Sequence, residues 1–288
     1  MDSTTTLEAT ARWTAAVRAV ETRREDHLFD DPWAAELAGP EGLAWIEART
    51  PESALPIALR TRYFDDWLQR STDAGARQQV VLLGAGLDTR SFRLPWPADA
   101  LVFELDRQTI LDHKEEVLSR AGATPRCERR VVAADLTDDW PEALSLAGLE
   151  AQRPTTWLLE GLLFYLPDEQ IVQILDEVTR LAAPGSHLGF DIVNAAVLTS
   201  PYTRPWIEMQ AAAGAPWLGT MEDPVGFLED RGWLASLTQA GQPDANHGRW
   251  KLPVVPTTLP DFPHSWFVTS TRPVAPRAGP LRVGFRGE

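Results

Sequence analysis

The sequence is poor in cysteine, in positive charge and in long apolar runs. Cys127 is the only cysteine among 288 residues, so the chain cannot form an intramolecular disulfide or a cysteine-rich zinc site. The 27 lysines and arginines face 41 aspartates and glutamates, and the formal charge of -14 leaves no basic excess for nucleic acid or an anionic membrane. No apolar run approaches the roughly 20 residues of a membrane span. We therefore expect no metal, no nucleic acid and no membrane as partners.

The start of the chain also lacks a targeting signal. Met1-Asp-Ser-Thr-Thr-Thr6 has neither the basic beginning nor the apolar stretch of a signal peptide, which predicts a cytoplasmic protein. A chain of 288 residues forms one or two domains and buries about three quarters of its unfolded surface. Its length and composition therefore suit an ordinary enzyme with a large apolar core, as a monomer or a homodimer.

What the sequence does contain is an apolar run that ends in two glycines. Val80-Val-Leu-Leu83 leads into Gly84-Ala-Gly86, and Phe103-Glu104-Leu105-Asp106 follows about twenty residues later. Glycine lets the main chain turn sharply and lets a ligand approach it, and a carboxylate at the end of the next strand accepts hydrogen bonds from ribose hydroxyls. The pattern predicts the nucleoside-binding corner of an α/β sheet, although a glycine pair can also be a plain strand-to-helix turn.

The residues after the glycines favour a cofactor without phosphate. A dinucleotide site repeats glycine at the position that Thr89 occupies here, and its helix N-terminus receives a pyrophosphate. Asp88 would place an acidic side chain against that anion. S-adenosylmethionine has no phosphate and carries a sulfonium and an ammonium, so it suits this corner better than NAD does.

Strand and helix patterns alternate from Val80 onward. Helix patterns cover 55–70, 107–120 and 168–182, and strand patterns cover 80–84, 101–105, 129–134, 155–160 and 186–192. This alternation predicts an α/β fold with a parallel sheet and right-handed crossovers. Before it, the chain is helical up to about Gln79, with Asp31-Pro32 as a helix cap followed by proline.

The alternation stops after Asp191. Residues 195–225 predict an inserted helical lid, residues 227–233 a helix that turns into a strand, and His264–Ser270 a final edge strand; the proline-rich pieces 253–263 and 273–280 are loop and tail. Many of the twelve tryptophans belong to the core, but some fall outside the sheet pattern and are candidates to line an aromatic pocket: Trp13, Trp33, Trp45, Trp67, Trp206 and Trp217.

Five motifs in order carry a resemblance to a known family. They are Arg60-Thr-Arg62-Tyr-Phe-Asp65, Leu83-Gly-Ala-Gly-Leu-Asp-Thr-Arg90-Ser-Phe-Arg93-Leu94, Phe103-Glu-Leu-Asp106, Ala134-Asp135-Leu136 and Leu159-Glu160-Gly161-Leu-Leu-Phe-Tyr165-Leu166. Together with Asp30-Asp-Pro-Trp33 they resemble the leucine carboxyl methyltransferase-like family over roughly residues 20–270. That family includes protein phosphatase carboxyl methyltransferases and bacterial carboxyl or O-methyltransferases of polyketide biosynthesis.

The resemblance implies a fold and a division of the chain. The fold is a class I, Rossmann-like S-adenosylmethionine-dependent methyltransferase with seven strands, the last antiparallel, an N-terminal helical extension and an inserted helical lid. We expect one methyltransferase domain over 1–288, made of the helical extension 1–79, the cofactor-binding core 80–192, the lid 193–235 and the C-terminal strands and tail 236–288.

The resemblance also implies which residues hold S-adenosylmethionine. The set is Arg60 for the cofactor carboxylate, Gly84 for its methionine part with Gly86 as a further cofactor-binding glycine, Asp106 for the ribose with Glu104 as substitute, Asp135 and Leu136 for adenine, and Glu160 for the amino group. The chemistry agrees, because a guanidinium offers parallel donors to a carboxylate and Glu160 can neutralise an ammonium.

Several residues have a second, structural interpretation. Arg60 can be a solvated helix charge, and Asp135-Leu-Thr137 is also good helix-capping sequence. We expect Arg90 and Arg93 to form structural ion pairs rather than contact ligand. Tyr165 and Tyr202 are candidate substrate contacts.

The sequence predicts a small-molecule O-methyltransferase that acts on a carboxylate or a hydroxyl of an aromatic or polyketide-like metabolite. Direct methyl transfer requires mainly alignment of the reacting atoms, and the five histidines fall in no recognisable base motif, so no catalytic residue is assigned. Two alternatives stay open. One is methylation of a protein C-terminus, and the other is an S-adenosylmethionine-binding scaffold or a cofactor-assisted rearrangement without methyl transfer.

Overall fold

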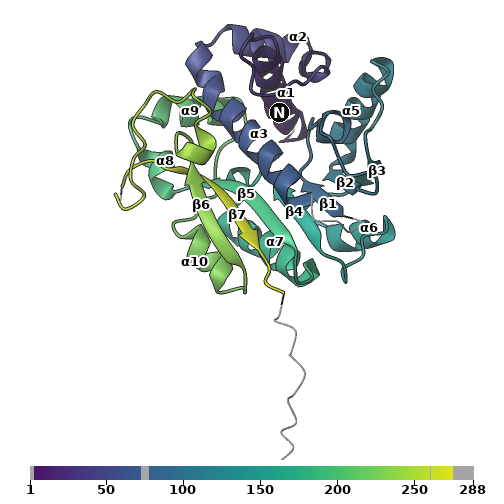
Figure 1. Cartoon of the computed structure of the whole chain (residues 1–288). Helices are drawn as coiled ribbons and strands as arrows, with labels where there is room; N and C mark the ends of the chain where they lie inside the picture. Colours follow the sequence, from purple (N-terminus) through teal and green to yellow (C-terminus); the bar gives the residue numbers. More distant parts are fainter. Residues whose placement is uncertain (1–2, 73–77, 260, 275–288) are drawn as a thin grey trace, which may run out of the picture.

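A single mixed sheet organises the chain in the computed structural model, which describes residues 3–72, 78–259 and 261–274. Seven strands form this sheet in the order β3-β2-β1-β4-β5-β7-β6 (Figure 1). Their bounds are β1 Gln79–Leu83, β2 Leu101–Asp106, β3 Glu128–Ala133, β4 Thr155–Leu159, β5 His187–Val193, β6 Leu234–Gln239 and β7 Ser265–Thr271. The first five strands are parallel and β7 is antiparallel to both neighbours, which confirms the predicted methyltransferase fold.

One strand was placed wrongly by the sequence pattern. The run 264–270 was expected at the edge of the sheet, but β7 pairs with β5 on one side and with β6 on the other. The edge belongs to β6, whose first residue, Leu234, is 66% exposed. The middle of β7 is buried and apolar at Trp266, Phe267 and Val268, because the strand is paired on both sides, whereas β6 is exposed or half-buried up to its last residue, the buried Gln239.

Alternate residues of the strands point into two separate apolar layers. Val80 and Leu82 of β1 pack with Phe64 and Leu68 of α3, which crosses one face of the sheet (Figure 1). Their neighbours in β1 pack instead with α6 and α7 on the other face. This two-sided burial explains why the strand reads as a continuous apolar run.

The helices between the parallel strands have the bounds α4 Arg90–Arg93, α5 Gln108–Arg120, α6 Trp140–Leu146 and α7 Asp168–Leu181. Of these, α5 and α7 agree closely with the predicted segments 107–120 and 168–182, whereas α4 and α6 were not predicted. The Asp139 carboxylate caps α6 by accepting the backbone N–H of Glu142. The apolar residues of α7 form one stripe that is buried throughout: Ile171, Ile174, Leu175, Val178 and Leu181.

Within the described residues 3–72, which precede the sheet, the chain forms the helices α1 Ser3–Thr22, α2 Ala34–Glu47 and α3 Pro51–Thr72. The prediction that Asp31 caps a helix was wrong. The α2 helix begins at Ala34, and Asp31 instead pairs with Arg18 of α1 at 2.8 Å and accepts the Thr89 hydroxyl at 2.7 Å. A buried guanidinium outcompetes backbone N–H groups for this carboxylate because a charge-assisted bond is stronger.

The segment after β5 contains short helices, as predicted. Its elements are α8 Ala195–Thr199, α9 Arg204–Ala212, α10 Pro224–Glu229 and the short η2 Pro243–Ala245. The predicted turn from helix to strand over 227–233 corresponds to the end of α10 and the start of β6. The predicted tail lies outside the described residues from 275 onward. No helix in the described part of the chain is long and apolar enough to cross a bilayer.

Candidate functional site

A cavity of about 330 Å³ opens at the carboxyl ends of β1, β2 and β4. Gly84 follows β1, Asp106 ends β2 and Glu160 follows β4, so all three reach it. In the sheet, β2 lies on one side of β1 and β4 lies on the other. The direction in which the chain adds strands therefore reverses between β1 and β4. Crevices at such a reversal are the usual ligand sites of open α/β sheets.

The glycine turn forms one wall of the cavity. Gly84 has a φ of 69°, and a Cβ placed there would lie 3.0 Å from the Leu162 side chain. A side chain would therefore strain the backbone and also push Leu162 out of place. Gly86 also has a positive φ, and its backbone N–H donates to Asp106 at 2.6 Å.

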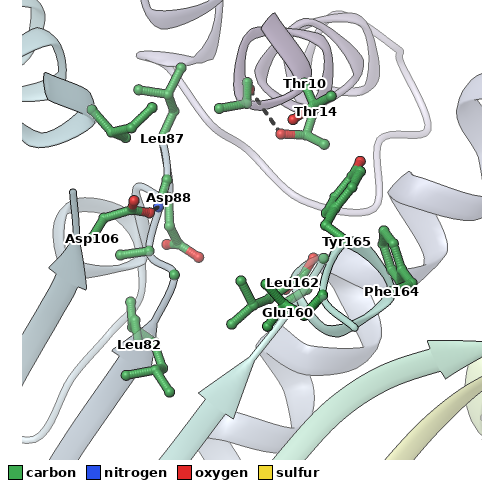
Figure 2. Close-up of a pocket in the computed structure, with 18 of the residues that line it drawn as sticks. Thr10, Thr14, Leu82, Leu87, Asp88, Asp106, Glu160, Leu162, Phe164 and Tyr165 are labelled. Atoms are coloured by element: carbon green, nitrogen blue, oxygen red, sulfur yellow. Dashed lines mark hydrogen bonds between the residues drawn. The ribbon is translucent and has the colours of Figure 1, made fainter. Parts of the chain in front are cut away.

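Asp106 is fixed at the tip of β2 by two backbone bonds. One carboxylate oxygen accepts the Gly86 N–H and the other accepts the Arg107 N–H at 2.7 Å. Burial raises the pKa of Asp106, although these two bonds oppose that shift. The carboxylate lies beside the glycine turn in Figure 2, where its remaining acceptor positions suit hydroxyl donors. Its ribose role stays a prediction.

Asp135 and Leu136 line the cavity after β3. The Asp135 carboxylate accepts the backbone N–H and the hydroxyl of Thr137, at 2.9 and 2.7 Å, and these bonds lower its pKa. The helix-capping interpretation does not hold, because Thr137 lies in a turn ahead of α6. Both residues line the same cavity as Asp106, and their adenine role stays a prediction.

Arg60 of α3 and Glu160 meet in a buried ionic network. The Arg60 guanidinium donates to Glu160 at 3.0 Å and to Asp191 of β5 at 2.8 Å. Burial alone would lower the pKa of Arg60, but these two carboxylates raise it. The interpretation of Arg60 as a solvated charge is therefore wrong. The structure brings Arg60 and Glu160 to the same cavity, as their predicted roles require.

Asp191 is part of this network, although no sequence pattern marked it as a site residue. It is 2% exposed, and its second oxygen accepts the backbone N–H of Gly161 at 2.6 Å. Burial raises the pKa of Asp191, and Arg60 opposes that shift. Asp191 thus holds two groups that line the cavity, the Arg60 guanidinium and the Gly161 backbone, while lying behind them.

Arg90 and Arg93 form structural ion pairs, which confirms the prediction for them. Both pair with Asp65 of α3 at 2.6 Å, and Arg90 also bonds Glu160 at 2.6 Å and the Asp88 carboxylate. Burial alone would raise the pKa of Asp88, but Arg90 lowers it to about 2. Asp88 lines the cavity directly after the glycine turn and is ionised there.

Glu104 does not reach the cavity, so the structure corrects its place as a substitute for Asp106. Its fully buried carboxylate pairs with Lys114 at 2.6 Å and with Arg129 at 2.7 Å and accepts the Ser91 hydroxyl. A carboxylate saturated in this way has a structural role, anchoring α4, α5 and β3 to β2.

The two candidate tyrosines have different surroundings. Tyr165, in the short helix η1 Leu163–Tyr165, lines the cavity, and burial raises the pKa of its phenol. Figure 2 shows its ring below Thr10 and Thr14 of α1, on the side of the cavity away from Asp106. Tyr202 is 81% exposed, stacks on Phe262 and is not among the cavity residues, so it was misplaced as a substrate contact.

Six aromatic side chains form the part of the cavity that we call the aromatic recess. They are Trp13, Trp45, Phe164, Tyr165, Trp206 and Trp217. Their rings contact one another in sequence, from Trp13–Trp45 at 4.7 Å through Trp45–Trp206 and Trp206–Trp217 to Trp217–Phe164 at 4.3 Å between centroids. Four of the six tryptophans singled out in the sequence line the recess, whereas Trp33 and Trp67 pack elsewhere.

The recess is closed by α1, whose position the sequence did not predict. Arg18 of this helix donates to the Leu87 carbonyl at 2.6 Å and to Asp31, which also binds Thr89. The helix is thus bonded to the glycine turn itself, and Ala11 lies over Gly86. The segment after β5 closes the cavity from another direction through Trp206, Gln210 and Trp217.

Comparison with known proteins agrees with the predicted family. Residues 11–179 match the family model described as leucine carboxyl methyltransferase. A protein of Frankia alni is 41% identical over 256 residues, which cover 84% of this chain and 87% of that one. A protein of Streptomyces coelicolor is 39% identical over 258 residues, with 84% and 88% covered. Both relatives carry the name S-adenosyl-L-methionine-dependent methyltransferase, which was assigned to them by inference.

Solved structures share the fold. A DUF574 family protein of Streptomyces avermitilis superposes with a TM-score of 0.60 at 20% identity and covers 90% of this chain and 97% of its own. A protein of Thermobifida fusca gives a TM-score of 0.59 at 17% identity, with 92% and 94% covered. The extent of the family match and the identity to the relatives establish that the chain belongs to the leucine carboxyl methyltransferase family of S-adenosyl-L-methionine-dependent methyltransferases.

Proposed function

We propose that the protein transfers the methyl group of S-adenosylmethionine to an oxygen of a small aromatic or polyketide-like metabolite. The observation that supports this most strongly is the aromatic recess, which adjoins the cavity at the sheet edge and is built from four separate parts of the chain. Flat aromatic walls of this kind suit a planar acceptor, since offset and edge-on ring contacts add to the gain from burial.

The charges around the cavity fit S-adenosylmethionine. Four carboxylates line it, those of Asp88, Asp106, Asp135 and Glu160. A pyrophosphate would lie against the ionised Asp88, whereas a cofactor with a sulfonium and an ammonium meets complementary charge there. In this proposal Asp106 holds the ribose, Asp135 and Leu136 hold adenine, and the backbone of Gly84 and Gly86 lies against the methionine part.

Arg60 and Glu160 would hold the amino acid end of the cofactor. Two Arg60 nitrogens are bonded to Glu160 and Asp191, which leaves donor capacity for a ligand carboxylate. Glu160 would neutralise the cofactor ammonium. The two residues already bond each other, so they are preorganised for a ligand group that carries both charges.

The chain's contribution to the reaction is mainly alignment and exclusion of water. When bound, S-adenosylmethionine supplies an electrophilic methyl group, which the acceptor oxygen takes with its own electron pair while the carbon–sulfur pair stays on sulfur. The recess would hold the acceptor ring, and α1 with Trp206 and Trp217 would exclude water. Alignment of reacting groups can contribute roughly 7–11 kcal/mol to lowering a barrier.

Two other functions make different predictions. A protein C-terminal carboxyl methyltransferase should label a peptide tail, and a scaffold or rearrangement enzyme should bind the cofactor and transfer no methyl. Incubation with S-adenosylmethionine labelled in its methyl group, followed by mass spectrometry of small molecules and of proteins, separates the three. Label in a small aromatic product supports the proposal, and label only in protein, or nowhere while cofactor binds, contradicts it.

The cofactor site is tested by calorimetric titration with S-adenosylhomocysteine. Asp106→Ala removes the proposed ribose acceptor, and we expect at least a tenfold loss of affinity, because a hydrogen bond to a charged group is worth about 1.5–3 kcal/mol. Asp112→Ala, an exposed aspartate on the neighbouring helix α5, is the matched control. Equal affinities of the two variants would remove Asp106 from the ribose role.

A further inference from the structure

Three buried polar atoms of the cavity wall around the aromatic recess have no hydrogen-bond partner among the described residues. They are the side-chain oxygen of Gln210 and the indole N–H groups of Trp45 and Trp217. Gln210 lies on α9, is 3% exposed and lines the cavity together with Trp45. Buried polar groups in folded proteins are nearly always paired, so each of these needs an explanation. A ligand that pairs them would provide one.

The Trp45 ring is held rigidly, which gives its N–H a fixed direction. It stacks on Trp13 with an angle of 10° between the ring planes, and the Arg49 guanidinium lies 3.7 Å from its ring centroid. Arg49 also donates to the Trp45 carbonyl and contacts Met209 of α9. These contacts connect α2 to the helix that carries Gln210, and so fix the Trp45 N–H and the Gln210 amide relative to each other.

The recess carries no formal charge among its described side chains. Besides the six aromatic residues, its polar members are neutral: Thr10, Thr14 and Gln210. The cavity's three arginines lie toward the cofactor side: Arg18 is paired with Asp31, Arg60 is paired with two carboxylates, and Arg107 directly follows Asp106. Arg49 lies against the Trp45 ring but is not among the residues that line the cavity. An acceptor carboxylate would therefore be buried without a cationic side chain in the lining of the recess, which is costly, whereas a phenol is neutral.

We propose that the acceptor is an uncharged hydroxyaromatic molecule, whose ring lies in the recess and whose polar substituents bond Gln210 and the Trp45 N–H. The methyl group then goes to a phenolic hydroxyl and not to a carboxylate. This inference rests on the proposed function and narrows its acceptor. Gln210 and Trp45 are specificity-determining residues in this account, since neither is required to hold the cofactor.

The transfer balances with water as the proton acceptor. The phenolic oxygen forms the new bond to the methyl carbon, the carbon–sulfur electron pair remains on sulfur, and the phenolic proton passes to a single water at the mouth of the cavity, which relays it to the bulk water that the closed recess otherwise excludes. The carboxylates nearest the reaction, Glu160 and Asp88, are both paired with Arg90. A phenol needs less help from a base than an aliphatic alcohol, because the phenolic pKa is only about 10.

The test uses two naphthalene probes that differ in one group. We would titrate 2,6-dihydroxynaphthalene and 6-hydroxy-2-naphthoate into the full chain by calorimetry at pH 7. Each titration is made once with saturating S-adenosylhomocysteine and once with sinefungin, whose amine provides a positive charge near the position of the sulfonium. We expect the dihydroxy probe to bind at least tenfold more tightly than the carboxylate probe with both cofactor analogues.

Gln210→Leu tests the specificity role. We expect it to weaken binding of the dihydroxy probe about fivefold or more, to leave S-adenosylhomocysteine affinity unchanged, and to keep or raise thermal stability, because an unpaired buried amide is removed. Gln173→Leu, an exposed position on α7, is the matched control and should change none of these. Unchanged cofactor affinity shows that the Gln210 variant is folded.

The outcomes distinguish a failure of the inference on the acceptor from a failure of the proposed function. If the cofactor analogues bind and neither probe does, or the carboxylate probe binds as well as the dihydroxy probe, the inference on the acceptor is overturned while the cofactor site stands. Unchanged probe affinity in Gln210→Leu would also overturn it. Failure of both cofactor analogues to bind would refute the proposed function itself, and the inference with it.

Discussion

Replacing Asp191 by asparagine tests whether a residue behind the cavity positions the cofactor site. The two side chains have the same shape, and the amide oxygen can still accept the Gly161 N–H that Asp191 now accepts at 2.6 Å. What the change removes is the negative charge that holds the Arg60 guanidinium at 2.8 Å. Arg60 keeps its bond to Glu160 at 3.0 Å, so it stays buried but can rotate about that remaining contact.

The expected loss concerns one ligand group only. If Arg60 binds the cofactor carboxylate, misplacing it costs one charge-assisted hydrogen bond, about 1.5–3 kcal/mol or roughly a 10- to 100-fold loss of affinity. That loss should appear for S-adenosylhomocysteine. It should be absent for 5′-methylthioadenosine, which has the same nucleoside and thioether but no amino acid. The ratio of the two affinities therefore isolates the Arg60 contact from any general damage.

Calorimetric titration of both nucleosides into Asp191→Asn and the parent chain provides the measurement. Asp66→Asn is the control, because Asp66 pairs with Arg62 on the same helix as Arg60 but lies near the surface. Equal losses for both nucleosides would show that Asp191 is only structural. Unchanged binding of S-adenosylhomocysteine would show that Asp191 does not position Arg60 for the ligand. Tighter binding would show that Asp191 competes with the ligand for Arg60. Either result would refute the reasoning.

Two further buried groups give predictions from their pKa values. Arg90 lowers the pKa of Asp88 from 3.8 to about 2 against the effect of burial, so ionised Asp88 stabilises the fold above pH 4 and loses this effect as the pH falls toward 2. In urea titrations Asp88→Asn should lower the free energy of unfolding by about 2 kcal/mol at pH 7 and by clearly less at pH 3, and equal losses at both pH values would contradict this. Burial and Glu104 raise the pKa of Cys127 from 9.0 to about 11, so its thiolate is about 100-fold rarer at pH 8. Iodoacetamide should alkylate it far more slowly in the native chain than in urea, as followed by mass spectrometry, and equal rates would be inconsistent with that pKa.

The fold was predictable because its signals are local. The run Val80–Leu83 is apolar on both faces, and such runs alternate with helices of regular spacing up to β5. The position of β7 was not predictable in this way. An inner antiparallel strand and an edge strand differ in what they pair with, and for residues 265–271 the partners lie at 187–193 and 234–239. Only the family resemblance indicated that the last strand is antiparallel.

The sequence predicted the site residues that lie at the carboxyl end of a strand, because the end of an apolar run marks their position. Glu104 and Asp106 are two residues apart on β2 and share a face of the strand, so the sequence could not separate them. Asp106 is the last residue of β2 and lies beyond the buried part of the strand, whereas the Glu104 carboxylate is enclosed by Lys114 and Arg129. Asp191 was missed for a different reason, since its partner Arg60 lies 131 positions away and no local pattern marks the pair.

The attachment of α1 has a consequence for how the chain is made. Arg249 bonds Glu21, near the end of this helix, at 3.0 Å and across 228 positions of sequence. During synthesis Glu21 leaves the ribosome before Arg249, which follows about 10 to 45 s later at the usual 5–20 residues per second. Trp13 can stack on Trp45 once α2 has been made, so the apolar side of the helix is covered early and the Arg249 contact is added late. The nascent chain therefore covers its glycine turn with α1 before Trp206 and Trp217, which complete the aromatic recess, have been synthesised.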